Sequence, residues 1–254
     1  MNLYDVNMNK ISDDSISQFL DIYESVYYYE AGFAAEKEIE DILLNGISGQ
    51  EDVFKILAWK IGGVDKNTSN KKGSLQYKDS WSFQDRVGKY RGGEIKLKDY
   101  LKRFNGDSLY ELKACADNPD KALSKLAKKA PKGLGPVYII TLFYFLTQGK
   151  KYPIYDKYAH AALKAILSDK EIHLGDEVID NSIKREFPSK NDSDKFGKEV
   201  MKENGKYREY MKLIDEFTEK TGIPYYATET ETNRRVDRAL WAYGHLFREV
   251  EKKS

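Results

Sequence analysis

The sequence predicts an all-α fold. Apolar residues recur three and four positions apart over most of the chain, which is the period of an amphipathic helix. Candidate helix starts carry acidic or capping residues, and Pro136 opens an apolar run that continues to Leu146. The 254 residues are enough to bury one large core, and no internal repeat is visible. We therefore expect residues 1–254 to form a single helical domain.

The first three predicted helices span 12–30, 33–44 and 50–61. The first has Asp13 and Asp14 in its opening turn, where carboxylates favour the helix dipole. Each segment has an apolar stripe at helical spacing. The stripe residues are, in turn, Ile16, Phe19, Leu20 and Tyr23; Ile39, Ile42 and Leu43; and Val53, Ile56, Leu57 and Ile61.

Residues 62–94 are rich in Gly, Lys, Asn, Ser and Asp, and this composition predicts a long loop. One interpretation is a structureless insert. The other is a DNA contact, because aromatic and basic side chains interleave there, a mixture that suits stacking on bases and contact with phosphates. The basic candidates are Arg86, Lys89 and Arg91.

Helical patterns resume at 96–104, 108–115 and 119–129. Residues 170–192 are polar, and their sequence does not predict one type of secondary structure. A long helix is expected over 194–221 with a break near Gly205, and a closing helix over 233–250. The closing helix has one apolar stripe of Val236, Leu240, Tyr243, Phe247 and Val250.

The segment 131–163 carries the strongest functional pattern. Gly133 and Gly135 predict a tight turn with positive φ and close backbone approach to a ligand. The helix that starts at Pro136 is apolar on all sides, so it is expected in the centre of the core. Its first N–H groups lack helical partners and favour an anion. A short loop, Tyr152-Pro153-Ile154-Tyr155-Asp156, then opens a new helix at its carboxylate.

These motifs resemble the helix-hairpin-helix DNA glycosylases. Leu123 and Leu126 precede the Gly133-Leu134-Gly135 turn. The loop that ends at Asp156 is close to the family's motif of a proline, an apolar residue, any residue and then an aspartate. The resemblance covers the hairpin and aspartate loop at about 119–168. It implies a two-lobed helical glycosylase-like fold, with Asp156 as the catalytic carboxylate and the hairpin on a DNA phosphate.

Two further segments are similar to an uncharacterised branch of this superfamily that has the 8-oxoguanine glycosylase fold. They are Ile56-Leu57-Ala58-Trp59-Lys60 and Arg234-Arg235-Val236-Asp237-Arg238-Ala239-Leu240-Trp241. Oxoguanine enzymes of the superfamily carry an additional N-terminal β-domain. This sequence starts directly with helical patterns, so we expect no such domain.

The proposed chemistry depends on Asp156. Cleavage of a base from deoxyribose passes through an oxocarbenium-like state, which a nearby carboxylate stabilises while it orients or deprotonates the attacking water. The alternative is that Asp156 is only an N-cap, a role worth about 1 kcal/mol. His160, one helical turn later, could tune the acid or contact phosphate, or could be a packed neighbour.

The DNA phosphate contacts implied by the resemblance are Lys132, Gly133, Gly135, Val137 and Lys157. Val137 stands where the bifunctional members of the family carry a lysine that forms a Schiff base, and valine cannot form an imine. We therefore expect a monofunctional enzyme without β-lyase activity. Lys132 could substitute only if the hairpin were remodelled.

Arg234, Arg235 and Arg238 invite a DNA interpretation, but a structural one is preferred. Asp237 suits a helix start, and the arginines can pair with carboxylates on adjoining helices. Trp59 and Trp241 are expected in the core or between helices.

Composition restricts the remaining possibilities. The net charge of +1 provides no global attraction to nucleic acid, so binding would depend on local patches. Cys115 is the only cysteine, so no intramolecular disulfide can form and we expect a cytoplasmic protein. Three histidines and one cysteine argue against a zinc site or an iron–sulfur cluster. No metal or organic cofactor is expected. Whether the 133–135 hairpin binds a monovalent cation is left undecided by the sequence. No membrane segment is expected, because the longest apolar run is far shorter than the about 20 residues that span a bilayer.

The leading hypothesis is a monofunctional DNA N-glycosylase of the base-excision repair type. It would act as a monomer on double-stranded DNA and excise a damaged or modified base. The second hypothesis is a non-catalytic DNA-binding protein on the same fold, in a defence or regulatory setting. The third is a helical module for protein interaction. Fold alone does not choose among them.

Overall fold

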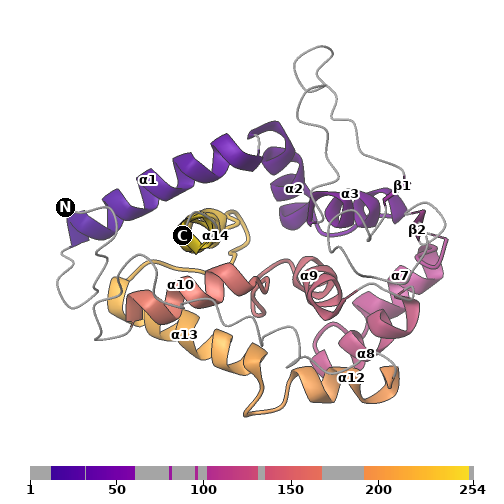
Figure 1. Cartoon of the computed structure of the whole chain (residues 1–254). Coiled ribbons are helices and arrows are strands. Elements are labelled where there is room, and N and C mark those ends of the chain that lie inside the picture. Colours follow the sequence, from indigo (N-terminus) through magenta and orange to yellow (C-terminus); the bar gives the residue numbers. More distant parts are fainter. Residues whose placement is uncertain are drawn as a thin grey trace.

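The computed structural model describes residues 13–31, 33–60, 80–81, 95–96, 102–130, 135–167 and 192–251. Within these residues the protein is all-α, as the sequence predicts, apart from two strands of two residues each (Figure 1). The helices are α1 (Asp13–Ala31), α2 (Phe33–Asn45), α3 (Gln50–Lys60), α7 (Gly106–Lys113), α8 (Pro119–Lys129), α9 (Pro136–Leu146), α10 (Lys157–Leu167), α12 (Ser193–Val200), α13 (Lys206–Thr221) and α14 (Arg234–Glu251).

The prediction of a helix over 96–104 is wrong where the structure describes it. Lys96 belongs to strand β2 (Ile95–Lys96), which pairs antiparallel with β1 (Ser80–Trp81). Helix α7 begins only at Gly106, because the extended Asn105 accepts a hydrogen bond from the Ser108 N–H at 3.0 Å. Apart from β1, the predicted loop 62–94 lies outside the described residues.

The predicted break near Gly205 is confirmed. Helix α12 ends at Val200, and Gly205 is the extended N-cap of α13. Helix α13 then ends at Thr221, and its C-cap Gly222 has a φ of +67°, the left-handed conformation that glycine adopts without a side-chain clash.

The helices pack around two central elements. Helix α14 lies between α1 and α10, while α9 contacts both α3 and α8 (Figure 1). Gly244 allows α14 to approach α10 closely, since a Cβ there would lie 2.3 Å from the carbonyl oxygen of Tyr158. This close approach brings α14 to the first turn of α10, directly after Asp156.

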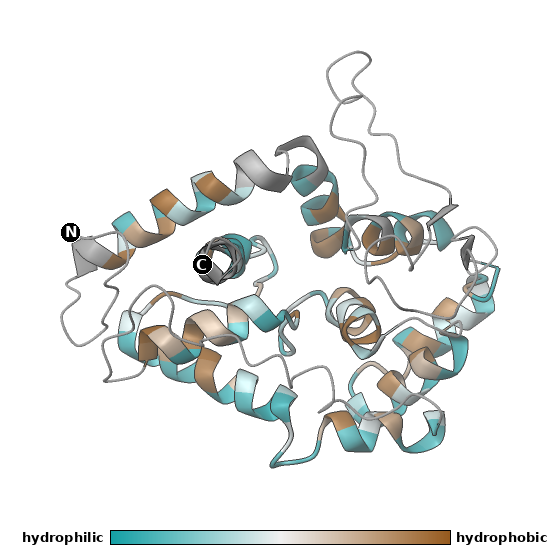
Figure 2. Ribbon diagram, viewed as in Figure 1, coloured by the Kyte–Doolittle hydropathy of each residue, from teal (hydrophilic) through white to brown (hydrophobic). Residues whose placement is uncertain are grey.

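Helix α9 is buried on all sides, as its uninterrupted apolar sequence predicts. Every residue from Ile139 to Phe145 is buried. By contrast, α12 and α13 are largely hydrophilic along their outer sides (Figure 2). Among the described helices, none is both long and apolar enough to cross a membrane.

Candidate functional site

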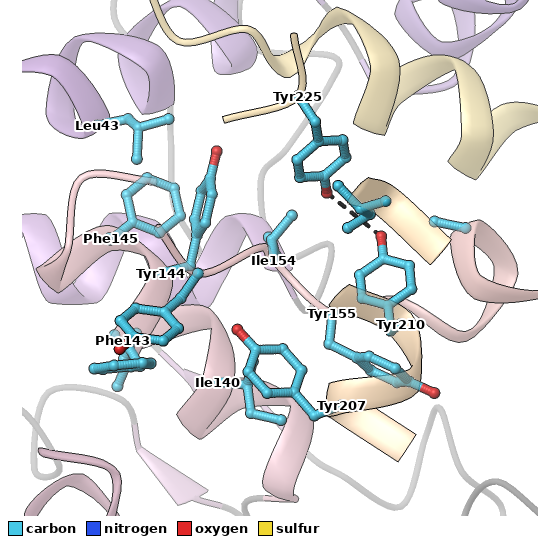
Figure 3. Close-up of a cluster of buried hydrophobic side chains, with 14 of the residues drawn as sticks. Leu43, Ile140, Phe143, Tyr144, Phe145, Ile154, Tyr155, Tyr207, Tyr210 and Tyr225 are labelled. Carbon is cyan, nitrogen blue, oxygen red and sulfur yellow. Dashed lines mark hydrogen bonds between the residues drawn. The ribbon is translucent and has the colours of Figure 1, made fainter. Parts of the chain in front are cut away.

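The 152–156 loop is anchored in the core. The ring of Tyr152 packs on that of Phe143, with 4.8 Å between the centroids. The Tyr207 hydroxyl donates to the Pro153 carbonyl at 2.7 Å. Tyr155 is fully buried and packs against Tyr207 and Tyr210 (Figure 3). These contacts hold the backbone before Asp156 in one place.

Asp156 caps helix α10. Its Oδ1 accepts a hydrogen bond from the Tyr158 N–H at 2.9 Å, and its carbonyl oxygen accepts from the His160 N–H at 2.9 Å. Asp156 is therefore an N-cap, and this role occupies only one of the two carboxylate oxygens. The second oxygen, Oδ2, lies 3.2 Å from Nζ of Lys60.

Lys60 is the site residue that sequence reasoning missed. It is the last residue of α3, and its Nζ lies 3.2 Å from Asp156 Oδ2 and 3.5 Å from the carbonyl oxygen of Tyr155. The two side chains of the pair are 11% and 16% exposed, whereas the pair of Lys55 with Glu38 is 21% and 30% exposed. The available signal was the Trp59-Lys60 pair at the end of an apolar helix.

The residue before Lys60 is held by a buried group that we call the Glu36 cluster: Tyr27, Glu36, Trp59 and Arg234. Glu36 accepts hydrogen bonds from the Tyr27 hydroxyl at 2.6 Å, the Trp59 indole N–H at 2.5 Å and the Arg234 guanidinium at 2.6 Å. The guanidinium also lies over the Trp59 ring, 4.7 Å from its centroid. The cluster thus fixes the end of α3 and the position of Lys60.

Asp237 lies beside the Glu36 cluster, and the charges of Lys60 and Asp156 also act on its carboxylate. It lies 3.5 Å from Arg234 and accepts a hydrogen bond from the Tyr225 hydroxyl at 3.4 Å. Burial raises the pKa of Asp237, and the charges of Arg234 and then Lys60 lower it, while that of Asp156 raises it. The structure therefore brings together three segments that the sequence singled out separately: 56–60, 152–156 and 234–241.

The structural interpretation of the other arginines is confirmed. Arg235 pairs with Asp21 and Glu24 on α1, and Arg238 pairs with Glu24 and with Glu40 on α2. Trp59 and Trp241 pack against the core, as expected: Trp59 beside Phe145, and Trp241 against Tyr27 and His245.

Of the alternatives for His160, the packed, hydrogen-bonded neighbour is the one that the structure confirms, and a phosphate contact is excluded by its burial. Its side chain is only 1% exposed, and its Nδ1 lies 3.1 Å from the Tyr155 hydroxyl. Its Nε2 faces Glu209 at 3.8 Å. Burial lowers the pKa of His160 to about 4, although the Glu209 charge raises it, so the imidazole is neutral at neutral pH. His160 supports Tyr155 from inside the core.

Gly135 does not have the expected positive φ. It is the N-cap of α9 at φ −75° and ψ 163°, which any residue adopts. Among the described residues, a Cβ at this position would meet only the Tyr138 ring at 4.0 Å, so neither this φ nor the described packing requires glycine, although glycine is one of the residues favoured at an N-cap. Pro136 occupies the first turn of α9, as predicted.

Of the other residues predicted to contact DNA, the structure describes Val137 and Lys157. Val137 is half-buried in the first turn of α9 and packs against the core. Lys157 opens α10, and its ammonium lies over the Tyr158 ring at 4.6 Å from the centroid. Lys132, Gly133, Arg86, Lys89 and Arg91 lie outside the described residues.

Within the described ranges, no group of three or more His, Cys, Asp or Glu side chains is arranged to hold a metal ion.

Comparison of the chain with models of known protein families, with curated proteins and with solved structures finds no match.

Proposed function

We propose that this protein is a DNA N-glycosylase on a two-lobed, helix-hairpin-helix glycosylase-like fold, and that Asp156 assists hydrolysis of the N-glycosidic bond. The observation that carries the proposal is the placement of Asp156. Its backbone is fixed by a buried loop, one carboxylate oxygen caps α10, and the other remains in a partly exposed position beside a lysine.

That placement suits a reaction in which positive charge develops on a sugar. A preorganised carboxylate stabilises an oxocarbenium-like state without having to reorganise, and it can orient a water molecule for attack. The target base must first leave the duplex to reach such a group. The hairpin helix α9 offers no amine at its second position, where Val137 stands, so we propose that base removal is hydrolytic and leaves an abasic site.

The start of α9 supports the DNA part of the proposal. Pro136 has no N–H, and the Tyr138 N–H donates to the Gly135 carbonyl at 3.1 Å, so the Val137 N–H is the first-turn donor that we propose for a phosphate. Gly135 has a φ of −75° that any residue adopts, and among the described residues a Cβ there would meet only the Tyr138 ring at 4.0 Å, so these residues leave room for a side chain. A close approach by a ligand backbone, which a side chain would block, is a reason for glycine here.

The experiment is a single-turnover panel. Duplex oligonucleotides, each with one damaged or modified base, are incubated with the wild type and with Asp156→Asn, and the released base is measured. Asparagine keeps an oxygen for the cap, so the variant tests charge rather than folding. Asp52→Asn is the matched control, because Asp52 also accepts a backbone N–H, that of Ser48 at 2.7 Å.

Release of one base by the wild type and the control, and its loss in Asp156→Asn, is the expected result. Duplex binding that persists in both variants without release of any base would favour the non-catalytic DNA-binding protein instead. Absence of any duplex binding would favour the protein-interaction module.

A further inference from the structure

We propose that Lys60 is a second DNA contact of the site, whose ammonium leaves Asp156 when DNA binds and pairs with a phosphate of the nucleotide held there. The proposal rests on the proposed function and deepens it, because it explains how a site built around a carboxylate admits a polyanion. It assigns no chemical step to the amine, which stays protonated throughout.

The charges around Asp156 make a cation necessary for the approach of DNA. Two cations and three carboxyl groups gather there: Lys60 and Arg234, with Asp156, Asp237 and Glu36. Each DNA phosphate carries a negative charge, which carboxylates repel and a nearby cation attracts. Arg234 is 1% exposed and donates to Glu36 at 2.6 Å, so a ligand does not reach it. Lys60, at 11%, is the partly exposed cation of this group.

The pair of Lys60 with Asp156 can exchange its partner. The ammonium lies 3.2 Å from one carboxylate oxygen and 3.5 Å from the carbonyl oxygen of Tyr155. By contrast, Lys55 on the same helix pairs with two glutamates. Desolvation offsets most of the attraction in a partly buried ion pair, so the net contribution of the pair to stability is small. A phosphate, which accepts the same charge-assisted hydrogen bond, can therefore replace Asp156 at little cost.

The position of the ammonium suits this exchange. Trp59, the residue before Lys60, donates its indole N–H to Glu36 at 2.5 Å, so the end of α3 is held beside the 152–156 loop. A deoxyribose at Asp156 carries a phosphate on each side, and the flexible four-carbon stem of lysine lets the ammonium turn from the carboxylate to one of them. The exchange also frees Asp156 Oδ2 for the sugar, so DNA binding itself completes the arrangement that base removal needs.

The test uses a short duplex that contains one tetrahydrofuran residue, a stable abasic analogue. This duplex offers a sugar that can leave the stack with its phosphates but without a base, so the test does not depend on which base the protein removes. Its affinity for the full-length protein is measured by fluorescence anisotropy over a range of salt concentrations, beside the same duplex without the analogue. The variants are Lys60→Met, Lys60→Arg and Lys55→Met, which controls for the loss of one positive charge from the same helix.

Lys60→Met should bind the tetrahydrofuran duplex at least about fivefold more weakly than wild type, because it lacks one charge-assisted phosphate contact. The slope of log affinity against log salt concentration should become shallower by about one, the value for a single lost contact. Lys60→Arg keeps the charge and should keep most of the affinity and the slope. Lys55→Met should resemble wild type. The unmodified duplex should distinguish the variants less, because its nucleotides stay in the stack.

Equal affinities and slopes for Lys60→Met and Lys55→Met would overturn the proposal. A weaker affinity of Lys60→Met at an unchanged slope would also overturn it, because Lys60 would then act only by holding Asp156 in place. An absence of duplex binding by the wild type would have the same consequence. The urea midpoint of Lys60→Met, measured in parallel, should stay close to wild type.

The outcome is separable from that of the base-release panel. Base release by the wild type, together with unchanged duplex binding by Lys60→Met, would remove the phosphate contact and leave the glycosylase. Duplex binding that depends on Lys60, without release of any base, would leave the contact and favour the non-catalytic DNA-binding protein.

Discussion

Two ion pairs lie close together in this molecule and differ in nearly every physical respect. Arg234 and Glu36 are each 1% exposed, and Glu36 has hydrogen-bonding partners on α1, α3 and α14. Lys60 and Asp156 are 11% and 16% exposed, and a single contact joins them. Glu36 is held by three hydrogen bonds, although Nε and Nη2 of Arg234 are buried without a hydrogen-bond partner among the described residues. A buried pair held in this way is structural, whereas a partly exposed pair with one contact can exchange its partner for a substrate.

The two pairs are also connected. Trp59 belongs to the Glu36 cluster and Lys60 to the ion pair, and the two residues are consecutive at the end of α3. The Glu36 cluster therefore positions the Lys60–Asp156 pair. Substitutions in the cluster and in the pair can separate their roles.

The largest effect on stability is expected from Arg234→Met. This change leaves the Glu36 carboxylate buried without its cation, and breaking such a pair costs about 3–5 kcal/mol of unfolding free energy. Urea denaturation measures the loss. Arg235→Met is the matched control, because Arg235 is 43% exposed and its pairs should contribute less than about 1 kcal/mol. Equal losses in the two variants would contradict the distinction.

A smaller effect is expected from acid, through His160. The folded-state pKa of about 4 lies below the ordinary value of 6.5, so the unfolded chain binds a proton first as pH falls. The stability conferred by the neutral imidazole is complete above pH 6.5 and is lost between about pH 6.5 and 4, to an extent of about 2–3 kcal/mol. Wild type should therefore lose more stability than His160→Gln over this range. Parallel pH profiles of urea unfolding would contradict the burial argument.

Lys60→Met should change the unfolding free energy by less than about 1 kcal/mol, in contrast to Arg234→Met. Water still reaches Asp156, and its cap to Tyr158 is unaffected. Thermal and urea unfolding of the variant measure the change. A loss as large as that of Arg234→Met would show that Lys60 belongs to the structural cluster.

The smallest effect on stability is expected from Gly135→Ala. The φ of −75° and the open space around Gly135 accommodate a methyl group, so stability should change by less than about 1 kcal/mol. Duplex affinity, measured by fluorescence anisotropy, should fall at least about threefold because the methyl group blocks phosphate approach. Unchanged affinity would remove the start of α9 from the proposed DNA contact.

Local signals in the sequence predicted much of the helical framework. Prolines and capping residues marked the starts of α8, α9 and α10, and the apolar run of α9 predicted its burial. Asp156 was predicted at the start of α10 for the same local reason. The prediction of a helix over 96–104 was wrong where the structure describes it, because Lys96 pairs in β2 and residues 102–104 precede the cap of α7.

The ion pair between Lys60 and Asp156 could not be predicted in this way. The two residues are 96 positions apart, and their meeting depends on how α3 packs against α9 and the 152–156 loop. Lysine at the end of a helix is ordinary, because it complements the dipole. The sequence predicted that the arginines pair with carboxylates on adjoining helices. It did not identify Glu36 on α2 as the partner of Arg234.

The measurement that tests the central claim most directly is the single-turnover rate of base release by Asp156→Asn, taken on the duplex that the wild type cleaves and accompanied by the unfolding free energy. We predict a rate at least about 100-fold below wild type, with stability within about 1 kcal/mol and with Asp52→Asn unchanged. A rate within a few-fold of wild type in the folded variant would contradict the proposed role, because Asp156 would then be a helix cap and nothing more.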